Sequence, residues 1–123
     1  MKIIDTTTFF EEEMMMDIRF NILNQYVDYF VVCEALFTHR GDKKKINFDI
    51  SKYPKFKHKI IHLILEKEPD DLIKNIKDTK DFNIRINSIK RIAAQRNFIE
   101  SALKDFSQDD YIIYSDNDEI PNL

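Results

Sequence analysis

Apolar residues along this chain fall into short runs whose period alternates between that of a strand and that of a helix. Lys2 to Ile4 is a short apolar start typical of a strand. Three further runs are rich in β-branched and aromatic residues: 28–34 (DYFVVCE), 59–65 (KIIHLIL) and 110–115 (DYIIYS). All three predict strands, and the nearly continuous apolar run at 28–34 is typical of a strand buried on both faces of a parallel sheet.

The first helix is predicted from a capping box and a four-residue repeat. Thr8-Phe9-Phe10-Glu11 has the form of a capping box, so we expect a helix to start there, with three glutamates near its positive end. Its apolar face is predicted to comprise Met14, Ile18, Ile22 and Tyr26, with Met15 and Leu23 beside them.

The second helix is predicted over residues 88–106 from apolar residues at spacings of three and four. These are Ile89, Ile92, Ala93, Ile99, Leu103 and Phe106. Residues 38–58 are predicted to form an irregular connection with a short strand at 46–48. The polar residues 66–83 are predicted to form a second connection, with room for one short helix.

The resulting order, β-α-β-loop-β-α-β, predicts an α/β fold: a mostly parallel sheet with flanking helices, forming a single domain over residues 1–123. Ligands of such sheets bind outside the carboxyl ends of the strands. We expect several polar residues at that edge: Asp5 and Thr6 after the first strand, Glu34 after the second and Asp116 to Glu119 after the last.

Composition and charge argue against nucleic acid and membrane as general binding partners. The formal net charge is -3, so no general attraction to nucleic acid is expected. No apolar run approaches the ~18 residues of a membrane span, and the start lacks the apolar stretch of a signal peptide. The single cysteine, Cys33, excludes an internal disulfide and suits a reducing compartment, which predicts a cytoplasmic location.

Asp116 and Asp118 form an Asp-x-Asp pair directly after the last predicted strand. A turn at the end of a strand can bring both carboxylates toward one hard cation such as Mg²⁺ or Mn²⁺, whose remaining positions take waters or substrate phosphates. The same pair also occurs in acidic turns that bind nothing. Its position after a buried strand favours a metal site, and its place on the last strand rather than the first disfavours a phosphatase of the haloacid dehalogenase type.

Arg96 stands on the apolar stripe of the second predicted helix, between Ile92 and Ile99. One interpretation is that its stem packs while its guanidinium reaches water. The other follows from geometry: Arg96 lies about 15 Å back along the helix from Phe106, and the returning strand covers roughly 20 Å. Arg96 would then lie level with the strand tip, where its guanidinium could bind Asp116 or a diphosphate.

Four blocks, in this order, resemble glycosyltransferase family 17 over residues 2–121. They are KIIDTTTFFEEEMMMDIRFNIL, VDYFVVCEALFTHRGDKKK, AAQRNFI and YIIYSDNDEIP. The resemblance implies a partial GT-A (Rossmann-like) nucleotide-sugar-binding domain. The implied activity is metal-dependent transfer of N-acetylglucosamine from a UDP-sugar to a glycan acceptor.

The resemblance also implies roles for individual residues. Asp118 would be the main ligand of a divalent metal, commonly Mn²⁺, and Asp116 would touch the metal or the ribose. Arg96 and Asn97 would border the diphosphate. By the same resemblance, the nucleoside would be bordered by Asp5, Thr6 and Glu34.

Two departures from the family pattern bear on these expectations. The family usually has a tryptophan upstream of Gln95-Arg96-Asn97, where this chain offers Phe82. Family domains also continue past the Asp-x-Asp pair, so the catalytic base is expected beyond this chain's end. The hypothesis is a donor-binding half that is truncated after the Asp-x-Asp strand, or completed by a second polypeptide or by self-association. The alternative is a non-catalytic remnant or interaction module.

Overall fold

The computed structural model describes residues 1–73 and 81–123 and confirms the α/β fold class. Four strands form one sheet in the order β3-β2-β1-β4, and each neighbouring pair is parallel. The strands are β1 (Ile3–Phe9), β2 (Tyr29–Ala35), β3 (Ile60–Leu65) and β4 (Tyr111–Tyr114). All four predicted strands are therefore present, but β4 is a largely exposed edge strand and not the buried strand that its apolar run predicted.

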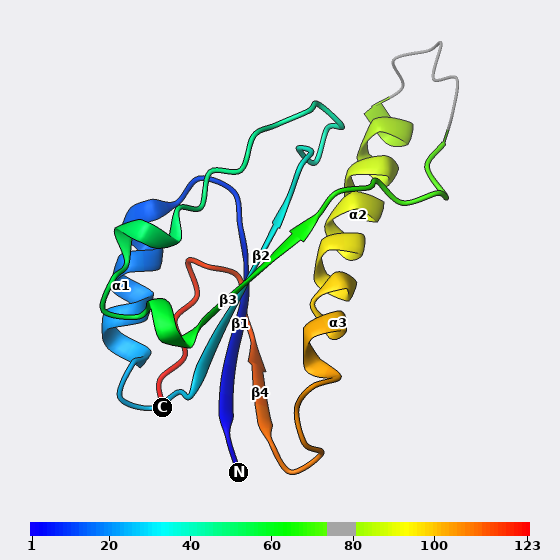
Figure 1. The fold of residues 1–123 in the computed structure, drawn as a ribbon. Coiled ribbons are helices and arrows are strands. Elements are labelled where there is room, and N and C mark those ends of the chain that lie inside the picture. The colour runs from blue at the N-terminus through cyan, green and yellow to red at the C-terminus, as the bar shows by residue number, and fades with distance from the viewer. Residues whose placement is uncertain (74–80) are drawn as a thin grey trace.

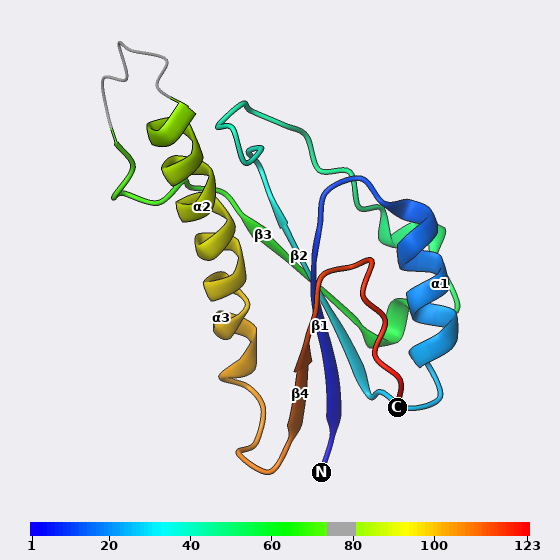
Figure 2. The same cartoon turned by 180° about the vertical axis from the view of Figure 1, so that it is seen from behind.

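Helices cover both faces of this sheet, as Figures 1 and 2 show. Helix α1 (Glu13–Leu23) lies on one face with two short 3-10 turns, η1 (Ile50–Lys52) and η2 (Lys57–Lys59). Helices α2 (Asp81–Phe98) and α3 (Glu100–Leu103) lie on the other. On the α1 side, Phe20 and Phe30 pack against Phe48, Tyr53 and Phe56.

The strand order locates the edge at which a ligand is expected. From β1 the chain adds β2 and β3 on one side, then returns through α2 and α3 to place β4 on the other side of β1. The connection that leaves β1 runs through α1 on one face, whereas the connection that enters β4 comes from α2 and α3 on the other, and the strand order reverses between β1 and β4. Open parallel sheets bind ligands at such a switch point.

The first strand is longer than predicted, and the capping box is wrong. The threonines are β-branched and continue β1 to Phe9, with Thr6 and Thr7 buried in the sheet. Helix α1 therefore begins only at Glu13, and its N-cap residue Glu12 makes no side-chain capping bond. Asp5 and Thr6 lie within β1, and Glu34 lies within β2, rather than after these strands.

The predicted apolar face of α1 is also wrong. Met14, Ile18 and Ile22 are 77%, 39% and 47% exposed. The buried face comprises Met16, Arg19, Phe20 and Leu23. Apolar residues occupy two sides of this helix, and the aromatic residues contributed by 48–56 select the side that carries Phe20.

Three smaller predictions change as well. The second helix divides into α2 and α3 and starts at Asp81, and the most buried face of α2 is polar: Asn87, Arg91 and Gln95. No strand forms at 46–48. The part of the 66–83 connection at 74–80 lies outside the described residues, and residues 66–73 contain no helix.

Candidate functional site

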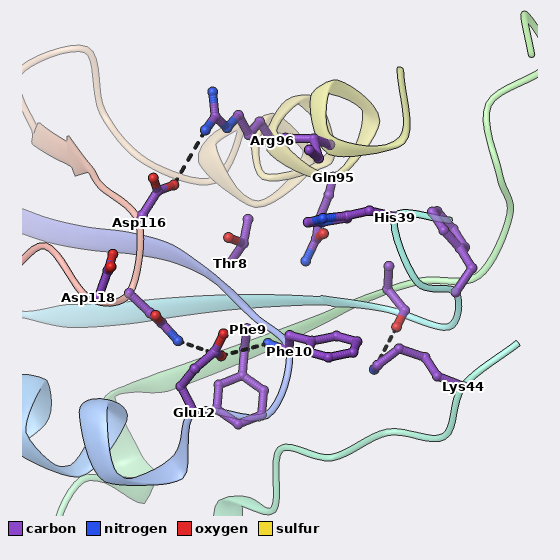
Figure 3. A pocket seen from close by; sticks show the side chains of 14 residues that line it. Thr8, Phe9, Phe10, Glu12, His39, Lys44, Gln95, Arg96, Asp116 and Asp118 are labelled. Carbon is purple, nitrogen blue, oxygen red and sulfur yellow. Dashed lines mark hydrogen bonds and ion pairs between the residues drawn. The ribbon is translucent and has the colours of Figure 1, made fainter. Parts of the chain in front are cut away.

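A cleft of about 360 Å³ opens at the carboxyl edge of the sheet, beside the switch point. Its walls come from the ends of β1 and β2, from α2 and from the segment after β4 (Figure 3). Three predicted site residues line it: Arg96, Asp116 and Asp118. The other lining residues are Thr8, Phe9, Phe10, Glu12, Ala35, Phe37, His39, Lys44, Ile92, Gln95 and Asn117.

Acidic side chains gather on the turn that follows β4. The Glu119 amide donates to the Asp116 carbonyl at 2.9 Å, which closes the turn. Carboxylate oxygens of Asp116, Asp118 and Glu119 all lie within 4.8 Å of one another and face solvent. This set of hard oxygen donors fits Mg²⁺ or Mn²⁺, which keep waters or phosphate oxygens in their other positions. Asp116 and Asp118, with Glu119 added by the structure, are the residues that could hold such an ion.

Arg96 reaches the strand tip, as its position on the helix predicts. Its Nη2 lies 3.4 Å from Asp116 Oδ1, and both side chains are half exposed. The guanidinium also lies 5.5 Å from the ring centre of Tyr114, close enough for a cation–π contact. Burial raises the pKa of Tyr114, so its phenol is neutral beside Arg96 at pH 7. Arg96 thus offers a positive charge at the rim of the cleft, next to the acidic turn.

Glu12 and Asn117 tie the acidic turn to the start of α1. The Asn117 amide donates to Glu12 Oε2 at 2.7 Å, and the amides of Phe10 and Glu11 donate to the same oxygen at 3.1 Å. Partial burial raises the pKa of Glu12, but these hydrogen bonds outweigh it and hold the pKa below its usual value. Glu12 is therefore an anion in the cleft. It was expected only in the first turn of a helix and not at the site.

His39 lies at the opposite end of the cleft from Asp118, near Phe10 (Figure 3). Partial burial lowers the pKa of His39, and the nearby Arg96 charge lowers it further, so the imidazole is neutral at pH 7. Arg91 holds this loop by donating to the His39 carbonyl at 3.0 Å. Gly41 is needed there because its φ is 96° and an added Cβ would lie 2.6 Å from the Arg91 guanidinium.

The structure does not bring the other predicted nucleotide contacts into the cleft. Asp5 is buried and accepts two hydrogen bonds from Arg19, at 2.6 and 2.7 Å. Thr6 donates to the Ile113 carbonyl of β4. Glu34 accepts from Lys44 and from two backbone amides. Asn97 is exposed on α2 beside Arg96 and does not line the cleft.

Comparisons with known proteins bear on this edge of the sheet. The family model described as glycosyltransferase family 17 matches residues 1–123. The β-1,4-mannosyl-glycoprotein 4-β-N-acetylglucosaminyltransferases of Rattus norvegicus, Homo sapiens and Mus musculus are each 27% identical over 124 residues. The alignments cover 98% of this chain and 22% of each relative, so the chain spans about a fifth of their length.

No solved structure matches the chain. In the part of the chain that the structure describes, every helix is too short or too polar to cross a membrane. The family match extends over every residue that builds the cleft, from β1 through the acidic turn. On this match, the chain belongs to glycosyltransferase family 17.

Proposed function

We propose that the cleft binds the UDP-N-acetylglucosamine donor of a metal-dependent N-acetylglucosaminyltransferase whose acceptor is a glycan. The observation that carries this proposal is the meeting of Arg96 with the Asp116–Glu119 carboxylates at the sheet's switch point. Family membership and the relatives' names support the sugar. The domain would be the donor half of a GT-A fold.

The charges in the cleft argue for a divalent cation. Glu12, Asp116 and Asp118 line the cleft, and their carboxylates would repel a diphosphate. A divalent cation bound by Asp118 and Asp116 would neutralise these two carboxylates, and Arg96 adds a donor suited to phosphate oxygens. When bound, Mn²⁺ or Mg²⁺ would stabilise the charge that develops on the departing diphosphate.

The nucleoside would lie toward the aromatic end of the cleft. Phe10 and the neutral ring of His39 lie toward that end (Figure 3), and flat ring surfaces of this kind suit a base. Three residues that we expected beside the nucleoside would instead act beneath the cleft, by fixing the strands that carry it: Asp5, Thr6 and Glu34.

Arg96→Ala is expected to weaken binding of UDP roughly tenfold in the presence of Mn²⁺, because it removes one charge-assisted contact to phosphate. The matched control is Arg85→Ala, an exposed arginine on the same helix that does not line the cleft. Isothermal titration checks both variants. Equal affinity of Arg96→Ala and wild type would remove Arg96 from the diphosphate site.

A nucleotide series tests the proposal. Thermal unfolding in Mn²⁺ should show that UDP-N-acetylglucosamine and UDP raise the transition temperature far more than UMP, which lacks the second phosphate. A ligand at 100 times its Kd adds about 2.7 kcal/mol to the unfolding free energy, enough to see clearly. If no nucleotide stabilises a protein that is demonstrably folded, the proposal fails and a non-catalytic remnant becomes the better account.

A further inference from the structure

Arg19 is a charged residue on the buried face of α1, with a fully inaccessible side chain. Nε and Nη2 donate to the two carboxylate oxygens of Asp5, at 2.7 and 2.6 Å. A buried cation needs such a partner, and this pair alone would explain why Arg19 is tolerated in the core. The pair does not account for the other hydrogen bonds that Arg19 makes.

The remaining donors of Arg19 all reach the acidic turn. Nη1 donates to the carbonyls of Asp116 and Glu119, at 3.1 and 2.8 Å, and Nη2 donates to Ser115 Oγ at 2.5 Å. The guanidinium therefore bridges the residues on both sides of Asp118. A lysine could not do this, because its single ammonium lacks the planar array of donors that spans these acceptors and Asp5 together.

We propose that Arg19, oriented by Asp5, is the positioning residue of the metal-binding turn: it fixes the backbone of 115–119 and thereby aims the Asp116 and Asp118 carboxylates. The inference rests on the proposed function for the identity of the ligand, but not for the tether itself. Residues that hydrogen-bond to the segment carrying the metal ligands raise the affinity for the metal. Without them, each carboxylate would have to become ordered when the ion binds, which costs free energy.

The competing interpretation is that Arg19 only stabilises the core. The double variant Asp5→Leu, Arg19→Met separates the two roles. It replaces the buried pair with apolar residues, a change that often preserves stability, and it removes every bond to the turn. Arg19→Lys is the second variant, since it keeps a positive charge near Asp5. Lys59→Met is the matched control, because Lys59 also donates to carbonyls, those of Asn24 and Val27 at the far end of α1.

Hydrogen exchange of the metal-free 123-residue chain is the first measurement. The Glu119 amide donates to the Asp116 carbonyl, so its exchange reports on the turn. We expect this amide to exchange at least tenfold faster in the double variant and in Arg19→Lys, and at the wild-type rate in Lys59→Met, since loss of one charged hydrogen bond is worth about that factor. Unchanged exchange of the Glu119 amide in a folded double variant would overturn the proposal.

Mn²⁺ affinity, from the electron paramagnetic resonance signal of the free ion, is the second measurement. The double variant should bind Mn²⁺ roughly 10–100-fold more weakly than wild type, the range seen when ligand-orienting groups are lost. Equal affinity in a folded double variant would also overturn the proposal. If wild type binds no Mn²⁺, the proposed function fails instead, while the exchange measurement still decides whether Arg19 orders the turn.

Discussion

Asp5→Ala is expected to lower the free energy of unfolding by about 3–5 kcal/mol, the usual cost of leaving one member of a buried ion pair without its partner. Arg19 is completely buried; when the Asp5 carboxylate is removed, its Nε loses its acceptor and its Nη2 keeps only Ser115 Oγ. Urea denaturation followed by circular dichroism measures the change.

Asp105→Ala is the control for this substitution, because Asp105 is exposed just beyond α3 and its removal should change stability by about 0.5 kcal/mol or less. The double variant Asp5→Leu, Arg19→Met should recover much of the loss, since no buried charge then remains unpaired. A loss below about 1 kcal/mol for Asp5→Ala would mean that Arg19 finds another counterion or water, contrary to the packing described above.

Glu34→Gln is expected to destabilise the protein by roughly 3 kcal/mol at pH 7. The Glu34 side chain is inaccessible and accepts from Lys44 Nζ at 2.6 Å and from the amides of Asn47 and Phe48 at 2.6 and 3.0 Å. Burial alone raises the pKa of Glu34; His62, 3.5 Å away, Lys44 and the two amides outweigh burial and lower the pKa to about 2. A glutamine at this position would turn an NH₂ donor toward the Lys44 and backbone donors, and it would lack the negative charge of Glu34.

The same group makes stability depend on pH in a defined direction. The folded-state pKa of Glu34 is about 2, below the usual 4.5, so the unfolded chain binds the proton more readily. Its contribution is complete above about pH 5 and is lost as pH falls from 4.5 toward 2. Denaturation at several pH values should show the difference between wild type and Glu34→Gln shrinking across this window. Glu66→Gln, at an exposed position, should show no such trend; a difference independent of pH would contradict the assignment.

The strands and the position of the site could be predicted because their signals are local. Runs such as YFVVC and YIIY are rich in the β-branched and aromatic residues that favour strands, and the β-α-β alternation puts their carboxyl ends at one edge. Arg96 could be placed beside Asp116 because helix rise and strand rise fix how far the chain returns. The contact at 3.4 Å confirms that argument.

The helix faces could not be predicted because they depend on partners distant in sequence. Helix α1 carries Ile18 on one side and Phe20 on another, and only the packing of Tyr53 and Phe56 decides which is buried. From the sequence, a charged residue such as Arg19 is expected at the surface. The structure shows that Asp5 and the carbonyls of the acidic turn surround it. Buried polar networks of this kind leave no hydrophobic period in the sequence.

Glu12 is a cleft residue that the sequence did not reveal, and the reason is different. It lies in a connection, where position depends on turns and long-range hydrogen bonds rather than on periodicity. Glu34 was expected at a free strand end, but β2 continues to Ala35 and Lys44 returns over it. A strand that continues one residue further than expected is enough to move a carboxylate from a site into the core.

The central claim is that Asp118 helps to hold a divalent ion that links the protein to the diphosphate of a UDP-sugar. Calorimetric titration of UDP-N-acetylglucosamine tests it most directly, in Mn²⁺ and in EDTA, for wild type, Asp118→Asn and the exposed control Asp105→Asn. We expect wild type and Asp105→Asn to bind alike in Mn²⁺, and binding to weaken about a hundredfold or more in EDTA or with Asp118→Asn. Equal binding by wild type in EDTA, or by Asp118→Asn in Mn²⁺, would contradict the account.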